Sequence, residues 1–196
     1  VLIVGPENTP YENGFHLFDF NFPKNYPVSP PFVLFVSTDR RIRAHPNLYI
    51  NGKVCLSFLG TWSGPGWTAA LTLNTILLSI QSLLNEEPLH NEPGYQNEKG
   101  SRCEIYRNLV NYYNIVVSTL KQINTPLRGY EAFQKIMKSH FVKNYDNYLK
   151  QLEKFKDISQ INQCVYGMGA KIEYSKVKQE LIDTYKKITS EPEFMS

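Results

Sequence analysis

The chain has 196 residues, of which 42% are hydrophobic and 20% are charged, and its net charge at pH 7 is +3. This is the composition of an ordinary globular protein, and it excludes an intrinsically disordered chain. The near balance of 21 basic and 18 acidic residues gives no reason to expect nucleic acid as a partner. Because no apolar run approaches the roughly 20 residues that span a bilayer, the sequence also predicts no membrane partner.

Three cysteines, Cys55, Cys103 and Cys164, are too few and too widely spaced for a disulfide framework, and they form no C-x-x-C pair for zinc. They favour a reducing compartment, the cytoplasm or the nucleus, and indicate no metal site. The chain begins on the apolar run Val1–Val4, which has the pattern of the middle of a strand. We therefore interpret the sequence as a segment of a longer protein.

An antiparallel sheet is predicted near the start of the chain. Apolar residues over 1–4, an alternating run over 15–22 and a third run over 32–36 indicate three strands, and a turn-rich segment joins the first two. The second strand carries His16 and three phenylalanines on one face. We expect this strand to pack on one side, and His16 to be structural.

Four prolines, at positions 23, 27, 30 and 31, interrupt regular structure after the second strand. The loop they form can be a rigid connector. It can also be a partner surface with Val28 exposed at its tip, because a stiffened loop loses little entropy on docking.

Helical patterns dominate the rest of the chain. A helix over 72–84 has a threonine as its N-cap and an apolar stripe that would cover the sheet, and a helix over 101–120 starts with the form of a capping box. A long amphipathic helix over 133–155 and a last helix over 177–188 flank a break at 166–170. These patterns predict an α+β chain.

The segment over 45–56 brings an amide, a turn and a thiol together. Most lone cysteines are inert apolar residues. Here, however, Pro46 can fix a turn and Asn47 can offer an amide donor to an oxyanion close to Cys55. The segment therefore predicts a thiol-centred active site.

Several motifs occur together around this cysteine: His45–Asn47, Asn51–Leu56 and Trp67, and before them Gly5–Phe15 and Phe22–Pro31. In combination they resemble the active-site signature of ubiquitin-conjugating (UBC) enzymes. The likeness extends to a long-tailed member of that family through Cys55–Trp67, His90–Tyr95 and Pro126–Gly129. It implies a UBC-like fold, an antiparallel β-meander backed by helices, in residues 1–125. The family's N-terminal helix is missing, and residues 126–196 would form a helical C-terminal extension packed on the core.

The resemblance implies that Cys55 accepts ubiquitin, or a ubiquitin-like protein, as a thioester from an activating enzyme and passes it to a substrate lysine. It assigns oxyanion stabilisation to Asn47, with a second role in tying down the loop, and handling of the lysine proton to Glu92. Supporting residues of the active-site loop would be His45, Pro46, Ser57 and Asn91. Contacts to ubiquitin ligases would involve Val28, Pro30, Trp67 and Ala69.

Two positions depart from the family pattern. Ser57 stands where many members carry aspartate, and Ala69 replaces a proline in a ligase-contact loop. His45 is expected to bond the backbone of the turn. The implied partners are the modifier, its activating enzyme (the usual or the alternative one), ligases and substrate proteins. We expect a monomer that binds no cofactor, since the activating enzyme consumes the ATP.

Two alternatives stay open. One is a catalytically weak ubiquitin-binding scaffold, although such relatives lack the cysteine. The other is a cysteine hydrolase, in which His45 or His90 would lie within hydrogen-bond reach of Cys55. The conjugating interpretation requires a thiol that the carboxyl end of a protein can reach, with the Asn47 amide facing the same spot.

Overall fold

The computed structural model describes residues 1–194, so the last two residues of the predicted extension lie outside the described part. Three strands, β1 (Leu2–Val4), β2 (Phe15–Asn21) and β3 (Phe32–Phe35), form an antiparallel sheet in the order β1-β2-β3. Leu17 faces Leu2 in one pair, and Phe18 faces Phe35 in the other. The predicted meander is confirmed.

The expected one-sided packing of β2 is wrong for its first half. Phe15, His16, Leu17 and Phe18 are all buried, whereas Asp19 and Asn21 are exposed. Because consecutive residues of a strand point to opposite faces, their burial shows that both faces of this half are covered, and β2 contacts the helical segment η3. His16 is accordingly a buried structural residue, and burial lowers its pKa to about 4.

Helix α1 (Leu73–Leu83) begins as predicted, because the Thr72 hydroxyl accepts a hydrogen bond from the Thr75 N–H at 3.2 Å. The capping box expected at the next helix is wrong: α2 (Ser101–Tyr113) has Gly100 as its N-cap and no side-chain cap bond. Helix α2 continues without a break through a π-helical stretch, η3 (Asn114–Lys121), into α3 (Gln122–Asn124).

The C-terminal part contains α4 (Gln134–Lys143), α5 (Tyr145–Glu153) and α6 (Tyr174–Thr189), with a small hairpin of β4 (Gln160–Ile161) and β5 (Ala170–Lys171) before α6. The 3-10 turns are η1 (Ser57–Leu59), η2 (Pro88–Asn91), η4 (Glu131–Phe133), η5 (Val165–Gly167) and η6 (Pro192–Phe194).

Two features of this part differ from the predicted pattern. The single helix expected over 133–155 is divided at Asn144, whose backbone leaves the helical conformation with φ of −108° and ψ of 18°. Its side-chain amide donates to the His140 carbonyl at 2.9 Å and so caps the end of α4. The β4–β5 hairpin was not predicted, because each of its strands has only two residues.

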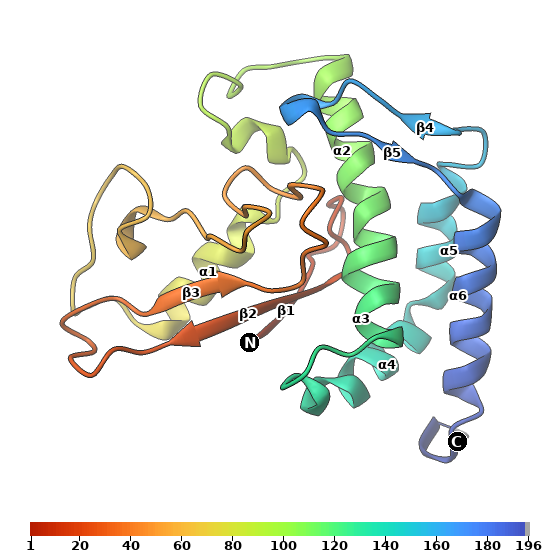
Figure 1. The fold of residues 1–196 in the computed structure, drawn as a ribbon, viewed down its shortest axis with the longest axis horizontal. Coiled ribbons are helices and arrows are strands. Elements are labelled where there is room, and N and C mark those ends of the chain that lie inside the picture. The colour runs from red at the N-terminus through yellow and green to blue at the C-terminus, as the bar shows by residue number, and fades with distance from the viewer. Residues whose placement is uncertain (195–196) are drawn as a thin grey trace.

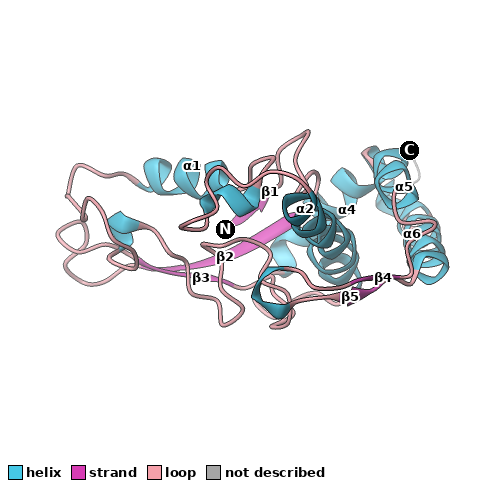
Figure 2. Ribbon diagram, turned by 90° about the horizontal axis from the view of Figure 1, so that it is seen from above, coloured by secondary structure: helices cyan, strands magenta, loops and turns pink. Residues whose placement is uncertain are grey.

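Helix α2 and its continuation stand between two halves of the molecule, with the sheet and α1 on one side and α4, α5 and α6 on the other (Figures 1 and 2). Both halves contribute to one hydrophobic cluster, in which Phe15 and Phe18 of the sheet occur with Phe141, Tyr148 and Leu181 of the tail helices. Tyr148 also donates its hydroxyl to the Asn13 carbonyl at 2.7 Å. Across residues 1–194, no helix combines the length and apolar content needed to cross a bilayer.

The turn before β2 depends on a close approach at Gly14. A Cβ atom at this position would lie 1.8 Å from Oδ1 of Asn114. Asn114 is fully buried and donates to the Glu12 carbonyl at 3.0 Å, so its side chain has little room to move. The sequence therefore needs glycine here for space.

We expect Gly14→Ala to lower the free energy of unfolding by about 1–3 kcal/mol, the usual range for an overpacked core site. The cost should be smaller when the same change is made in an Asn114→Ala background, because the clashing atoms are then absent. Urea unfolding of the four proteins in this double-mutant cycle measures both costs. Equal costs in the two backgrounds would contradict the steric explanation.

Candidate functional site

The turn that carries the predicted site is closed by two hydrogen bonds between Asn47 and Cys55. The Cys55 N–H donates to the Asn47 carbonyl at 2.8 Å, and the Asn47 side-chain Nδ2 donates to the Cys55 carbonyl at 2.8 Å. Between them, Tyr49 and Lys53 are also paired through their backbones. The amide thus ties down the loop and fixes the backbone of the cysteine.

His45 is fully buried and supports this turn from inside. Its Nδ1 accepts a hydrogen bond from the Asn47 N–H at 3.0 Å, which requires an unprotonated nitrogen at that position. Burial, and secondly the nearby charge of Arg43, lower the pKa of His45 to about 3. The imidazole is therefore neutral, and Pro46 beside it is buried too.

The Cys55 side chain has no exposed surface, so the expectation of a reachable thiol is wrong for this conformation. Thr61 holds the following loop across the neighbours of the cysteine: its Oγ1 accepts from the Leu56 N–H at 3.0 Å and lies 2.7 Å from the Val54 carbonyl, to which it can donate. Cys55 is one of the fully buried apolar residues of the core, and Val54 beside it is buried as well. The thiol is therefore inaccessible in this conformation.

Glu92 belongs to a small charged and aromatic group beside the turn. Its Oε2 accepts a hydrogen bond from the Tyr166 hydroxyl at 2.6 Å and lies 3.8 Å from a guanidinium nitrogen of Arg43. Arg43 donates to the Pro46 carbonyl, and its guanidinium carbon lies 3.8 Å from the centre of the Tyr49 ring. Arg43 therefore links the Glu92 carboxylate to the turn that holds Asn47.

Arg43 and Tyr166 were missed by the sequence analysis. Arg43 stands among several basic residues before the turn, and nothing in the pattern separates it from its neighbours. Tyr166 is 74 positions from Glu92, inside a stretch that the sequence marks only as a break. No local signal could have brought these side chains together.

The other two residues predicted to support the active site, Ser57 and Asn91, lie in the 3-10 turns η1 and η2. Ser57, at the start of η1, is partly exposed, and a Cβ atom on Gly64 would lie 3.0 Å from the Ser57 Cβ, so the loop folds back onto it. The Asn91 amide donates to the Pro88 carbonyl at 3.2 Å and so stabilises η2, the turn before Glu92.

The predicted ligase-contact loops meet through Trp67. Its indole N–H donates to the Pro27 carbonyl at 2.7 Å, which joins the proline-rich loop to the loop after Cys55. Val28 at the adjacent position is 75% exposed, and Ala69 is also exposed, while Pro30 is partly covered. The structure thus brings these side chains to neighbouring loops at the surface.

None of the four histidines of the chain forms a hydrogen bond with Cys55 in the described part of the structure. His45 bonds the Asn47 N–H, His90 lies 2.9 Å from the Glu98 carbonyl, and His140 lies 2.9 Å from the Asn13 side chain. His16 is buried and its ring has no hydrogen-bond partner among residues 1–194. Since no histidine hydrogen-bonds the Cys55 sulfur in the described chain, the geometry required of a cysteine hydrolase is missing.

Glu87, His90 and Cys103 have possible metal-ligand atoms within 4.8 Å of one another. Glu87 is paired with Arg107, however, and the His90 Nε2 already contacts the Glu98 carbonyl. Burial and the nearby carboxylates raise the pKa of the Cys103 thiol, which opposes the thiolate form that a metal requires. The three groups serve the local packing of α2 and η2.

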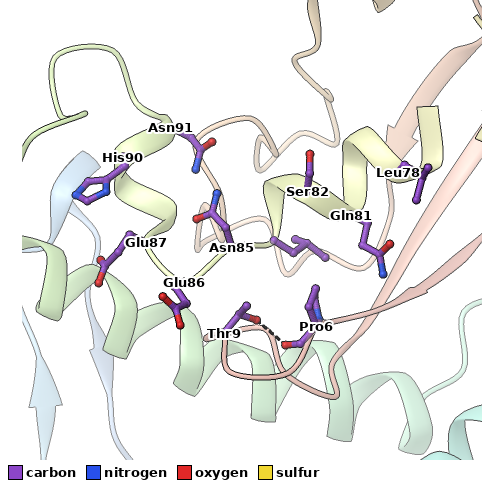
Figure 3. Close-up of a pocket in the computed structure, with 11 residues that line it drawn as sticks. Pro6, Thr9, Leu78, Gln81, Ser82, Asn85, Glu86, Glu87, His90 and Asn91 are labelled. Atoms are coloured by element: carbon purple, nitrogen blue, oxygen red, sulfur yellow. Dashed lines mark hydrogen bonds between the residues drawn. The ribbon is translucent and has the colours of Figure 1, made fainter. Parts of the chain in front are cut away.

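A pocket of about 740 Å³ lies between α1, η2 and the turn before β2 (Figure 3). His90 and Asn91 line it but point in opposite directions from η2, and Leu78 and Thr9 line its other side. Neither Cys55 nor Glu92 is among its lining residues. The pocket is therefore separate from the thiol.

The chain is similar in sequence to known proteins. The family model described as ubiquitin-conjugating enzyme matches residues 1–120. Ubiquitin-conjugating enzyme E2 Z of Xenopus tropicalis is 43% identical over 149 residues, covering 75% of this chain and 48% of that protein. The human E2 Z is 42% identical over 149 residues, covering 75% of this chain and 42% of that protein.

A further curated relative and one solved structure are also similar to parts of this chain. A probable ubiquitin-conjugating enzyme, E2 24 of Arabidopsis thaliana, is 35% identical over an alignment of 201 residues that covers 95% of this chain and 22% of that protein. The E2 domain of a Toxoplasma gondii ubiquitin-conjugating enzyme has 29% identity and a TM-score of 0.46, covering 60% of this chain and 77% of the solved chain. The chain spans less than half the length of these curated relatives.

The buried neutral state of His45 predicts a loss of stability in acid. The unfolded chain protonates this histidine below about pH 6.5, whereas the folded protein resists protonation down to about pH 3. The contribution of neutral His45 to the free energy of unfolding is therefore fully present above about pH 6.5. It is lost progressively as the pH falls towards 3, because protonation of this histidine then stabilises the unfolded chain.

The matched variant is His45→Asn, which keeps an acceptor for the Asn47 N–H but cannot titrate. We expect it to be less stable at neutral pH and to lose less of its free energy of unfolding than the original protein between about pH 7.5 and about pH 5. Urea unfolding across that range measures the slopes. If the free energy of unfolding changes equally with pH in both proteins, His45 does not contribute to the loss of stability in acid.

Proposed function

The chain belongs to the ubiquitin-conjugating enzyme family, and we propose that it carries ubiquitin or a ubiquitin-like protein on Cys55 and transfers it to substrate lysines. The observation that carries this proposal is the reciprocal bonding of Asn47 and Cys55 within the segment that matches the family model. Two of its relatives, from Xenopus tropicalis and human, are named ubiquitin-conjugating enzyme E2 Z.

The proposed reaction has two transfers. In the first, the Cys55 thiolate attacks the thioester carbonyl that joins the modifier to the activating enzyme; the new C–S bond forms, the old one breaks and the activating enzyme's thiolate leaves. In the second, a neutral lysine Nζ attacks the same carbonyl. The C–N bond forms, the C–S bond to Cys55 breaks, and the lysine nitrogen gives a proton to a base.

Little covalent assistance is needed for the second transfer, because a thioester is already activated towards an amine. Positioning and stabilisation of the tetrahedral oxyanion are the main contributions that the protein can make. Asn47 suits the second of these: its Nδ2 has two hydrogens, one of which is donated to the Cys55 carbonyl. The other hydrogen is the one we assign to the oxyanion.

Glu92 is the base or orienting group that we assign to the lysine. Its side chain is partly exposed and is tied through Arg43 to the turn that carries Asn47. The thiol itself is covered, so we propose that the loop over 57–66, which Thr61 holds against Val54 and Leu56, shifts when the modifier arrives.

The proposed partners are the modifier, an activating enzyme of the usual or the alternative type, ligases that contact Val28, Pro30, Trp67 and Ala69, and substrate proteins. The activating enzyme consumes the ATP, and no bound cofactor is proposed. Cys55, Cys103 and Cys164 are all free, which suits a reducing compartment, and we propose the cytoplasm or the nucleus. We propose that the protein acts as a monomer.

The two alternatives are less well supported. A scaffold that only binds ubiquitin has no need of the cysteine that this chain places after the Asn47 turn. A hydrolase needs a histidine on the thiol, and His45 and His90 are hydrogen-bonded elsewhere.

The direct test uses the full-length protein with ubiquitin, ATP and each activating enzyme. We expect an adduct that reducing agent removes and that Cys55→Ala does not form, whereas Cys103→Ala and Cys164→Ala still form it. Should no reducible adduct appear with ubiquitin or with ubiquitin-like proteins, the proposal is wrong. Cleavage of a ubiquitin fusion without ATP would support the hydrolase instead.

Asn47→Ala tests the oxyanion assignment. We expect the variant to accept the modifier on Cys55 but to discharge it to free lysine on the order of 100-fold or more slowly, the usual effect of losing one oxyanion donor. Asn51→Ala removes an exposed amide from the same turn and is the matched control. Discharge by Asn47→Ala at the unmodified rate would leave this residue only its structural hydrogen bond.

A further inference from the structure

The hairpin of the C-terminal extension reaches back to the candidate site. From β4 and β5 it crosses the end of α2, and its turn η5 lies beside the loops of the N-terminal half, away from α5 and α6 (Figures 1 and 2). A backbone contact secures it there, because the Arg43 N–H points at the Met168 sulfur at 3.0 Å. The extension therefore touches the segment that leads into the active-site turn.

Tyr166 stands at the tip of this hairpin in a left-handed conformation, with φ of 61° and ψ of 18°. This conformation is costly for a residue with a side chain, by about 1 kcal/mol or more, and it persists where surrounding contacts stabilise it. The contacts here are those of the Tyr166 side chain. Its ring lies 6.2 Å from the Tyr106 ring, edge to face, and 4.5 Å from the Arg43 guanidinium carbon.

The Tyr166 hydroxyl is the strongest of these contacts. It donates to Oε2 of Glu92 at 2.6 Å, the short distance typical of a hydroxyl bound to a carboxylate. Burial and this hydrogen bond raise the pKa of Tyr166, so the phenol keeps its proton and remains a donor. The side chain is nevertheless 41% exposed, which leaves this edge of the cluster open to an incoming group.

One hydrogen bond and one nearby positive charge thus act on the same oxygen of Glu92. Tyr166 binds Oε2, and Arg43, held between the Tyr49 and Tyr166 rings, adds its charge at 3.8 Å. Oε1 has no hydrogen-bond partner among residues 1–194. A glutamate side chain held by one oxygen in this way loses rotamer freedom while keeping its second oxygen for a ligand.

We propose that Tyr166 is a positioning residue for the acceptor step: it orients the Glu92 carboxylate so that Oε1 receives the ammonium or amine hydrogen of the attacking lysine. The C-terminal extension is then part of the acceptor side of the transfer site. This inference rests on the proposed function and on the role of Glu92 in it.

The experiment measures single-turnover discharge of the preformed thioester of the full-length protein to free lysine. Tyr166→Phe keeps the ring against Arg43 and Tyr106 and removes only the hydroxyl. We expect unchanged charging and a maximal discharge rate lowered by roughly 3- to 10-fold, the usual effect of losing one intramolecular hydrogen bond. The half-saturating lysine concentration should change less than the rate.

The matched control is Tyr174→Phe. Tyr174 also belongs to the tail and donates to a glutamate, Glu153, at 2.5 Å, but away from the turn. We expect this variant to discharge at the unmodified rate. Thermal unfolding of both variants checks that the tail stays folded.

A double-mutant cycle with Glu92→Ala separates positioning from a general structural role. If Tyr166 acts through Glu92, Tyr166→Phe has no further effect in the Glu92→Ala background. Additive effects, or normal discharge by Tyr166→Phe while Glu92→Ala is slow, would overturn this inference and leave the proposed function intact. If Glu92→Ala discharges at the normal rate, both the positioning role of Tyr166 and the role of Glu92 in handling the lysine proton are wrong. Failure of the original protein to form any thioester overturns the proposed function itself.

Discussion

Two hydrogen bonds between Asn47 and Cys55 close the turn around which the candidate site is built. Each residue donates to the carbonyl of the other, one through its backbone and one through its side chain. The rest of the arrangement depends on this closure. His45 supports the same turn from the buried side by accepting the Asn47 N–H, and Arg43 holds its outer side through the Pro46 carbonyl.

The closure also explains why the thiol is covered. With the Cys55 backbone fixed on one side by Asn47, the chain that follows folds back at Thr61, whose hydroxyl satisfies backbone groups of Val54 and Leu56. The segment after Cys55 contains Gly60, Gly64 and Gly66, and the Thr61 hydroxyl ties it to Val54 and Leu56. Exposure of the thiol requires this loop to move, which is the shift that we propose for the arrival of the modifier.

The C-terminal extension has two roles that arise from the same packing. Its helices complete the hydrophobic core on the far side of α2, with Phe141, Tyr148 and Leu181 in the cluster that also contains the sheet. Once those helices are docked, the hairpin before α6 has a fixed path across the end of α2. This path brings Tyr166 to Glu92, so a tail that stabilises the fold also contributes a side chain beside the active-site turn.

The elements that follow from local pattern were predictable. The three strands follow from alternating and apolar runs, the start of α1 from a threonine cap, and the site from motifs with fixed spacing. Where local preference competed with packing, prediction failed: Asn144 divides an apparently continuous helix, and Gly100 replaces the expected cap of α2. Propensity alone could not decide these cases, because each choice differs by only a few tenths to about 1 kcal/mol.

The sequence by itself determined the α+β class, the thiol-centred turn and the family, because these depend on residues that are close together in the chain. Only the tertiary structure decided that the Cys55 thiol is covered, that Arg43 links Glu92 to the turn and that Tyr166 binds the same carboxylate. The contact of Tyr166 with Glu92 spans 74 positions, and the contact of Met168 with Arg43, which holds the hairpin beside the turn, spans 125. Nothing in the local sequence encodes such contacts, since they form only when helices, sheet and hairpin have packed together.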